Sequence, residues 1–354
     1  MRVRFARRGA FAVAALALSV LCASCGTGGN ASDPSGAGAG SGTTLTVYTN
    51  QHPELIKGLT DEYTKETGVA FNIQNDATVG QIQAEGAASK ADVFLSEDPT
   101  PVAQLGAAGL LAPVDPATLA QVRPGLSSGK GLWVAYAARS RVLFCNPTLI
   151  DADKLPATLA DLAKPEYRGT FAWAPSGAFV ATTQYLIATQ GIDATRTFLE
   201  ALKANGTNEQ KNGNVRDTVE AGKHAMGLSN HYYWWVLANQ KGGPDKLTSK
   251  IYHFPTEDPG NLILSSGAGV LKSSPNAEEA QKFLAWLTAA DAGQKLIATA
   301  DPSVSEAQYP VAPGVASSIV GDLGDIQSPS FDMDRLADAA QAEDLLKQLG
   351  MSSG

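Results

Sequence analysis

The order of strand-like and helix-like segments in the N-terminal half limits the possible folds more than any other feature. Alternating apolar residues predict a strand at Leu45–Thr49, and a helix with one apolar face follows from about Pro53 to Gly68. Further strands are expected at Val69–Ile73 and Asp92–Leu95, each followed by a helical segment. Strands that alternate with helices favour an α/β fold with a mostly parallel sheet.

Further strands along the chain predict a second domain. A chain of 354 residues is long enough for two domains with separate cores. Two strands, Leu132–Ala137 and Val142–Cys145, are expected around Arg139-Ser140-Arg141, where the chain would cross into the second domain. Two more are expected within Leu262–Leu271, one on each side of Ser265–Gly269.

Residues 1–24 have the composition of an export signal. Arginines come first, an apolar run from Ala10 to Leu21 follows, and small residues end the segment. The apolar run is too short to span a membrane as a helix. Small residues before Cys25 favour a bacterial lipoprotein signal with Cys25 as the lipid attachment residue, and a plain cleaved signal peptide is the alternative.

A Gly/Ser/Ala-rich stretch, Gly26–Thr43, predicts a flexible linker, so residues 25–43 would tether a folded domain to a membrane surface. Loss of residues 1–24 removes four arginines and no acid, which changes the net charge from −8 to −12. An acidic mature protein argues against nucleic acid or an anionic membrane as the main partner.

Two adjacent tyrosines stand at the start of a predicted helix. Ala225–Leu228 is predicted as a buried strand, and Ser229 and Asn230 are favourable helix N-cap residues. Tyr232 and Tyr233 are therefore expected in the first helical turn, just past the end of a strand, where ligands of open α/β sheets bind. For such a pair taken alone, two aromatic rings packed in a core are the alternative.

Polar residues also follow three other predicted strands. His52 follows the first strand, Glu97 and Asp98 follow the third, and Ser176-Gly177-Ala178 follows a strand at Thr170–Trp173. Each half of the chain supplies two of the four sets, so two α/β lobes could turn all of them toward one cleft. Taken alone, these residues would fit a surface or capping histidine, a helix start and an ordinary helix cap.

Together these side chains suit a ferric ion. His52 would supply a neutral nitrogen, and Glu97, Tyr232 and Tyr233 would supply three anionic oxygens if both phenols ionise, which matches the charge of Fe³⁺. A free phenol has a pKa of about 10, so only a strong cation would hold two phenolates at neutral pH. The N–H groups of the helix start at Ser176–Ala178 could bind an anion that fills the remaining metal positions.

The motifs of several common enzyme classes are missing. The chain has no G-x-S-x-G, H-E-x-x-H or P-loop sequence, and none of its four histidines has a visible nucleophile–base context. A mononuclear iron oxidase on the same ligands is the enzyme alternative. The export signal and the tether favour capture and delivery, so we predict a binding protein that is not an enzyme.

Short runs spread over residues 44–315 form a pattern whose most specific part is Tyr232-Tyr233 with an upstream Ser176–Phe179. The other runs are Thr46–His52, Ala91–Phe94 with Glu97, Gly109–Pro113, Arg139–Val142, Asp258–Gly260, Ser266–Ala268 and Glu279–Phe283. In these runs the chain resembles the ferric-iron-binding proteins of bacterial ABC importers, in the periplasmic-binding-protein superfamily.

This resemblance implies a two-lobed periplasmic-binding-protein-like α/β fold of type II, with a mixed sheet and flanking helices in each lobe and hinge strands between the lobes. Residues 44–138 with 262–313 would form the first lobe, and residues 139–261 with 314–354 the second. The protein would be an extracytoplasmic, lipid-anchored monomer that closes on ferric iron and delivers it to a membrane permease and its ATPase.

The resemblance also implies the residues of the site. The iron ligands would be His52, Glu97, Tyr232 and Tyr233. A synergistic anion, phosphate or carbonate, would be held by five further residues, which are Ser176, Gly177, Ala178, Asn212 and Asn230.

Two residues depart from the family pattern. Asp98 stands where relatives often carry Gln beside the anion, and an acid there would repel an anion, which leaves the identity of the anion open. His231 stands where Asn is common, and we expect it to be an outward-facing spectator; the alternative is that its protonation near pH 6.5 tunes iron release. Wider relatives bind phosphonates, polyamines or thiamine, so a carrier of a phosphonate or another small organic ion is the alternative function.

Overall fold

The computed structural model describes residues 42–299 and 307–352. The predicted export signal, the predicted lipid attachment residue Cys25 and nearly all of the predicted linker lie outside these residues. The described residues belong to one compact unit, Gly40–Gly354.

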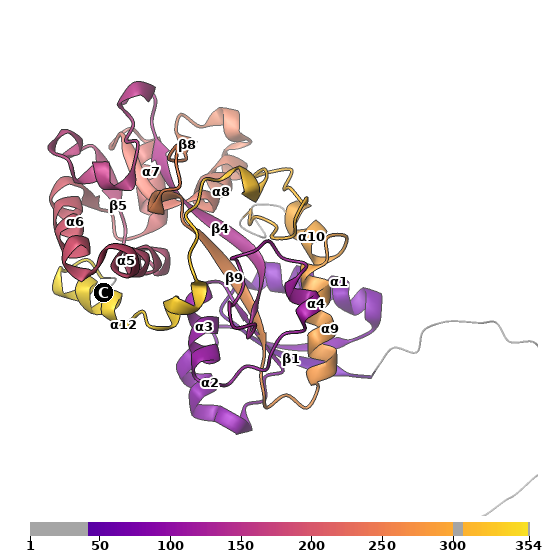
Figure 1. Cartoon of the computed structure of the whole chain (residues 1–354). Helices are drawn as coiled ribbons and strands as arrows, with labels where there is room; N and C mark the ends of the chain where they lie inside the picture. Colours follow the sequence, from indigo (N-terminus) through magenta and orange to yellow (C-terminus); the bar gives the residue numbers. More distant parts are fainter. Residues whose placement is uncertain (1–41, 300–306, 353–354) are drawn as a thin grey trace, which may run out of the picture. The chain divides into compact units, whose positions relative to one another are not determined.

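The structure contains strands and helices along the whole described part (Figure 1). The strands are β1 (Thr44–Thr49), β2 (Ala70–Gln74), β3 (Val93–Ser96), β4 (Val134–Cys145), β5 (Phe171–Trp173), β6 (Thr207–Asn208), β7 (Met226–Asn230), β8 (Lys250–Tyr252) and β9 (Ile263–Val270). The α-helices are α1 (Pro53–Thr67), α2 (Val79–Glu85), α3 (Pro99–Ala107), α4 (Pro116–Leu119), α5 (Gly177–Gln190), α6 (Ile192–Asn205), α7 (Asn212–Glu220), α8 (His231–Lys241), α9 (Ala277–Thr288), α10 (Gly293–Thr299) and α12 (Ala340–Gln348).

The N-terminal alternation of strands and helices is confirmed. Strand β1 pairs in parallel with both β2 and β3, and the connecting segments contain α1 and α2. Helix α1 ends where Gly68 adopts a left-handed conformation with φ 77°, which a residue without a Cβ atom adopts without a steric penalty.

Strand β4 is one strand of 12 residues, so the prediction of two strands around Arg139-Ser140-Arg141 is wrong. Up to Ser140 it pairs with β9, and from Arg141 onward it pairs with β7. The change of partner needs no break in the backbone, and every residue of β4 is buried. Figure 1 shows β4 and β9 running between the group of helices around α5 and α6 and the group around α1 and α9.

Strand β9 is also continuous, where two strands around a glycine-rich turn were expected. Its glycines allow neighbouring side chains to approach the backbone closely. A Cβ atom on Gly267 would lie 2.4 Å from Val102 Cγ1, and one on Gly269 would lie 2.8 Å from Leu111 Cδ1. Glycine here therefore marks close packing inside a strand, which the sequence pattern does not distinguish from a turn.

The sheet is mixed, with strand order β2-β1-β3-β9-β4-β7-β5-β6 and β8 paired to β4. Strand β9 is antiparallel to β3 and β4, and β4 is antiparallel to β7 and β8. The expectation of a mostly parallel sheet is confirmed only for β1–β3 and for β5 with β6 and β7.

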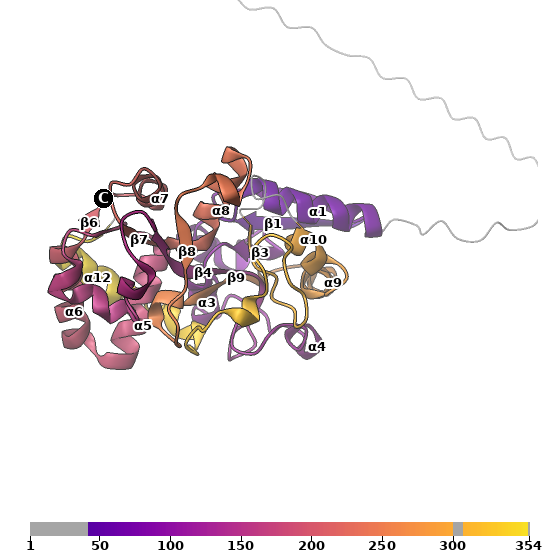
Figure 2. The ribbon, with the colours of Figure 1, turned by 90° about the horizontal axis from the view of Figure 1, so that it is seen from above.

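Two large groups of buried apolar side chains lie at different places along this sheet. One includes side chains of β1, β3, β9, α1, α3 and α9, and the other includes side chains of β5, β7, α5, α6 and α12. The view from above in Figure 2 separates the same two groups of helices. Two cores agree with two lobes, while the residue ranges predicted for each lobe stay a prediction.

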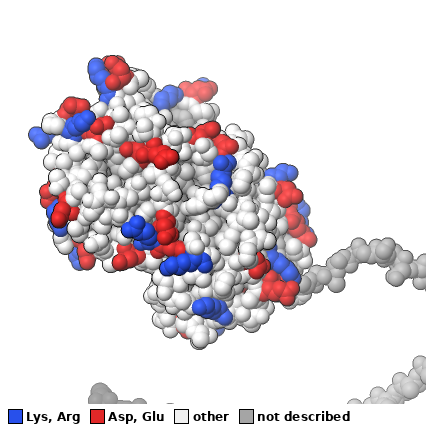
Figure 3. Space-filling model, in the orientation of Figure 1, with Lys and Arg blue, Asp and Glu red and all other residues white. Residues whose placement is uncertain are grey.

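On the face drawn in Figure 3, acidic and basic side chains are interspersed. Among residues 42–299 and 307–352, no helix combines the length and the apolar character that crossing a membrane requires.

Candidate metal-binding site

The two adjacent tyrosines lie at the start of α8, directly after β7, as predicted. The strand runs through Ser229 to Asn230, so the helix begins without the predicted side-chain cap. Tyr232 is 4% exposed, whereas Tyr233 is partly exposed. Their ring centroids are 4.3 Å apart at an interplanar angle of 30°. Two phenols are thus close together at the end of a strand.

His52 and Glu97, the two predicted ligands of the N-terminal half, also lie together. His52 occupies the N-cap position of α1, and Glu97 follows β3. The distance between His52 Nε2 and Glu97 Oε1 is 3.7 Å, and both side chains are partly exposed. The backbone N–H of Glu97 donates a hydrogen bond to Asn50 Oδ1 at 3.1 Å, which fixes the loop that carries the carboxylate.

Arg139 of β4 holds the acidic pair Glu97 and Asp98. Its guanidinium is 2% exposed; Nη1 donates to Glu97 Oε1 at 2.9 Å and to the Glu97 carbonyl at 2.8 Å, and Nη2 pairs with Asp98 Oδ1. Burial favours a higher pKa for Glu97, but Arg139 and the contact with His52 outweigh it and the pKa is lowered. For Asp98, burial raises the pKa, Arg139 opposes the rise and the Glu97 carboxylate adds to it, so the pKa is raised.

Arg141 extends the same side of β4 toward the tyrosines. It is 3% exposed, and Nη1 donates to Asn230 Oδ1 at 2.7 Å. Burial lowers the pKa of Arg141 to about 10, and the phenols of Tyr232 and Tyr233 are close enough to interact with it electrostatically. Arg139 also interacts with Tyr232 in this way. The two arginines therefore connect the Glu97 carboxylate with the two phenols.

Arg139 and Arg141 were not predicted as site residues. A signal was present, since two charged residues separated by Ser140 lie on one side of a strand, between two apolar runs. A buried strand with two cations on one side needs anionic partners there.

The predicted anion site is the start of α5. Ser176 is the N-cap residue, and its Oγ accepts a hydrogen bond from Phe179 N at 3.2 Å. Gly177 is exposed, and within the described residues the backbone N–H groups of Gly177 and Ala178 donate no hydrogen bond. These groups point away from the first turn of a long helix, which suits them to an anion.

The two asparagines of the predicted anion set have different surroundings. Asn230 binds Arg141, as described above. Asn212 is 5% exposed at the start of α7, and its Oδ1 has no hydrogen-bond partner within the described residues. Helix α7 is linked to the tyrosine helix because Arg216 Nη1 donates to the Tyr233 carbonyl at 3.3 Å.

Asp98 lies against the start of α5. A Cβ atom built on Gly177 would be 3.0 Å from Asp98 Oδ2, so the carboxylate touches the place where an anion was predicted. The structure thus brings a residue of the N-terminal half into direct contact with a residue of the second half.

His231 is fully buried, so the expectation that it faces outward is wrong. Ser140 N donates to its Nδ1 at 3.2 Å, and its Nε2 lies 2.9 Å from the Ala307 carbonyl, which requires the tautomer with a proton on Nε2. Its ring also packs on Tyr309 with centroids 4.5 Å apart. Burial lowers the pKa of His231 to about 3, so the side chain is neutral at physiological pH.

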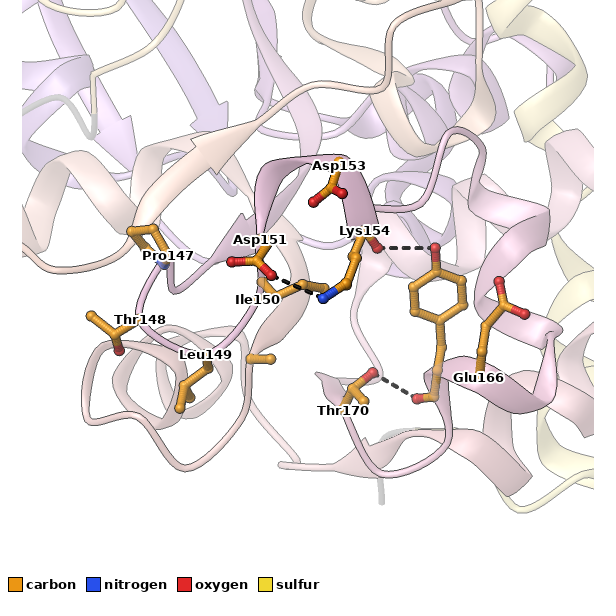
Figure 4. A pocket seen from close by; sticks show the side chains of 11 residues that line it. Pro147, Thr148, Leu149, Ile150, Asp151, Asp153, Lys154, Glu166 and Thr170 are labelled. Carbon is orange, nitrogen blue, oxygen red and sulfur yellow. Dashed lines mark hydrogen bonds and ion pairs between the residues drawn. The ribbon is translucent and has the colours of Figure 1, made fainter.

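A separate cavity of about 670 Å³ lies on another part of the second half (Figure 4). Thr148, Leu149, Asp151 and Glu166 are among its lining residues, and Asp151 pairs with Lys154 at 2.9 Å. None of the predicted site residues lines it, so its size does not make it the ligand site. Within the described residues, no three side chains of the His, Cys, Asp and Glu types gather as a metal cluster, and the predicted ligand set contains only two such residues.

Comparison with known proteins identifies the kind of protein to which this chain is similar. Residues 48–294 match the family model described as bacterial extracellular solute-binding protein. The Fe(3+)-binding periplasmic protein of Serratia marcescens is 37% identical over 312 residues, which cover 87% of this chain and 90% of that protein.

Solved structures agree with this relationship. Iron-bound HitA from Pseudomonas aeruginosa is 34% identical with a TM-score of 0.74, and the match covers 87% of this chain and 99% of that chain. The Trichodesmium protein IdiA (FutA), in complex with iron and citrate ligands, is 25% identical with a TM-score of 0.73, covering 87% and 100%. The predicted fold class is confirmed, the prediction of a solute-binding protein over an enzyme is confirmed, and the alternative of an organic-ion carrier is not favoured.

Proposed function

This chain belongs to the family of bacterial extracellular solute-binding proteins, and from this we propose that it captures ferric iron outside the cytoplasm and supplies it to an ABC importer. The observation that carries the proposal is the link made by β4. Its Arg139 binds the Glu97 carboxylate and also interacts with Tyr232 of the second half. One buried cation of β4 therefore lies near a proposed ligand of each half, which supports a shared site.

We propose His52, Glu97, Tyr232 and Tyr233 as the iron ligands. The His52–Glu97 distance of 3.7 Å and the ring separation of 4.3 Å between the tyrosines support two pairs of donors, each with its two members close together. One neutral nitrogen and three anionic oxygens match the charge and hardness of Fe³⁺. Iron is the cargo here, so the site has to release it as well as hold it.

The arginines would assist this site by favouring negative charge on the ligands. Arg139 lowers the pKa of Glu97, so this carboxylate is ionised before iron arrives. Arg141 lies buried near both phenols, so its positive charge would offset part of the negative charge of a site in which both oxygens bind iron.

A negatively charged group completes the proposed site at the start of α5. The predicted holders of phosphate or carbonate are Ser176, Gly177, Ala178, Asn212 and Asn230. Helix polarity and the N–H groups of Gly177 and Ala178, which have no partner within the described residues, support a negatively charged group in this region. Asp98 lies against Gly177, so a carboxylate of the protein is already present at this helix start.

Delivery would involve movement of the two lobes about β4 and β9. We propose that the second lobe, with Tyr232 and Tyr233, binds iron first and that closure adds His52 and Glu97. The predicted partners are a membrane permease and its ATPase, and the predicted form is a monomer attached to the membrane through a lipid on Cys25. The proposed lobes remain residues 44–138 with 262–313, and residues 139–261 with 314–354.

Substitution Tyr232→Phe tests the function directly. It keeps the ring contact with Tyr233 and removes only the phenolic oxygen. Loss of an outer-shell partner costs about 10–100-fold in metal affinity, so loss of a direct ligand should cost more than about 100-fold in competition with citrate. Tyr167→Phe is the matched control, because Tyr167 lies at the separate cavity and its hydroxyl donates only to the Lys154 carbonyl. Equal ferric affinity of Tyr232→Phe and the control would refute the assignment.

A further inference from the structure

We propose that the carboxylate of Asp98 is the anion partner of the bound iron, in place of an exogenous phosphate or carbonate. The inference rests on the proposed ferric function and specifies one component of that site. It concerns a residue that the ligand and anion sets above do not contain.

The side chain of Asp98 does not cap the helix that it precedes. It occupies the N-cap position of α3, directly before Pro99, where an aspartate commonly accepts a hydrogen bond from the first helical turn. Its side chain makes no such bond. Oδ1 instead pairs with Arg139, which turns the carboxylate away from its own helix and toward the second half of the molecule.

The other carboxylate oxygen reaches the start of α5. Asp98 Oδ2 would be 3.0 Å from a Cβ atom on Gly177, which is closer than nearly all ordinary contacts of a Cβ atom. Gly177 and Ala178 each have a backbone N–H without a partner within the described residues, and the helix dipole adds a favourable field for negative charge. An anion from solution at this helix start would share the space with a carboxylate and would be repelled by it.

The charges of the site also balance with Asp98 included. Fe³⁺ and the Arg139 guanidinium would be neutralised by Glu97, Asp98 and the two phenolates. Only the guanidinium of Arg141 remains, and it already donates to the amide oxygen of Asn230 at 2.7 Å. A dianion such as hydrogen phosphate or carbonate, added to this arrangement, would exceed the single positive charge of Arg141 and leave net negative charge in a largely buried place, which is unfavourable.

The test measures ferric affinity with and without added anions. The wild-type protein, Asp98→Asn and Asp98→Ala are titrated with ferric nitrilotriacetate in bicarbonate-free, phosphate-free buffer, and again with phosphate or bicarbonate added. The chelator is kept at one concentration throughout. Asp193→Asn, which removes an exposed acid on α6, is the matched control.

The proposal predicts that the wild-type affinity is unchanged by either anion. Without an added anion, Asp98→Asn and Asp98→Ala should bind iron about 10–100-fold more weakly than the control. Phosphate should restore much of the affinity of Asp98→Ala, where the space of the carboxylate is open. The iron-loaded wild-type protein should contain no phosphate or carbonate in equimolar amount, whereas Asp98→Ala loaded with phosphate present should contain it.

Other results would overturn the proposal. A wild-type protein that binds iron only when phosphate or bicarbonate is present, or that carries either anion in equimolar amount, contradicts it and leaves the ferric function intact. Variants at Asp98 that match the control in anion-free buffer also contradict it. If the wild-type protein binds no iron under any of these conditions, the ferric function itself fails. The anion content of the wild-type protein decides the question even if both variants fold poorly.

Discussion

Replacing Arg139 with methionine should destabilise the iron-free protein because it leaves two carboxylates without their cation. Arg139 is almost fully buried and binds both Glu97 and Asp98. Removing one partner of a buried ion pair costs about 3–5 kcal/mol. The acidic side chains keep 25% and 26% exposure, so water screens part of the uncompensated charge and the lower end, about 3 kcal/mol, is expected.

Thermal unfolding followed by circular dichroism measures this loss. A cost of about 3 kcal/mol corresponds to a fall in Tm of roughly 4–5 °C, because the entropy of unfolding grows with the length of the folded unit, here Gly40–Gly354. Arg196→Met is the control, since Arg196 is partly exposed and binds only Gln348 Oε1 at 2.8 Å. Such a surface change should stay within about 0.5 kcal/mol of the wild type.

The direction of the Tm change in a double variant shows whether uncompensated charge or lost packing causes the loss of stability. If uncompensated charge causes the loss, adding Asp98→Asn to Arg139→Met removes one of the two carboxylates and should recover part of the lost Tm. Neighbouring residues of one network couple by about 0.5–3 kcal/mol, so the recovery is measurable. An Arg139→Met protein as stable as the control, or a double variant less stable than Arg139→Met alone, would refute the electrostatic reasoning.

Two further predictions concern the second half of the molecule. Gly227→Ala should lower the free energy of unfolding in denaturant by about 1–3 kcal/mol, because its Cβ atom would lie 2.5 Å from Val215 Cγ1 and 2.9 Å from Val219 Cγ2. An unchanged free energy of unfolding would show that α7 moves aside without a cost in stability. Glu220→Gln should cost about 1 kcal/mol at pH 7 after allowance for solvent screening, because the carboxylate accepts hydrogen bonds from Ser249 N and Oγ. Burial opposes the ionised form of Glu220, but these bonds lower its pKa, so the stabilisation exists above the unfolded pKa of about 4.3 and disappears as the pH falls through the folded pKa. A difference from the wild type that does not shrink as the pH falls below about 4.3 would contradict this assignment, and Glu200→Gln on the exposed side of α6 is the control.

Local patterns predicted the fold best where each element makes its own signal. The apolar face of α1 and its glycine stop were both visible in the sequence, and the structure confirms them. At β4 and β9 the same reasoning was wrong, because arginines and glycines inside a strand were interpreted as the end of one. These residues have partners that are distant in the sequence. Arg139 binds Glu97 and Asp98, and the missing side chain of Gly267 leaves room for Val102.

The features of the site also divide into those that the local sequence could predict and those that it could not. The tyrosine pair could be predicted because strand, helix start and phenols are adjacent in the chain. The burial of His231 could not, since it depends on Ser140 and on Ala307, which lie on other segments. The contact between Asp98 and Gly177 joins the two halves of the molecule, so only the tertiary structure could reveal it.

The most direct test of the ferric assignment is the visible absorption spectrum of the purified protein during titration with ferric citrate. Phenolate oxygens bound to iron give a broad charge-transfer band, so ferric binding through Tyr232 and Tyr233 predicts a band that saturates at an equimolar amount of iron and is weakened or shifted in Tyr232→Phe. A colourless protein that removes no iron from citrate would contradict the ferric assignment.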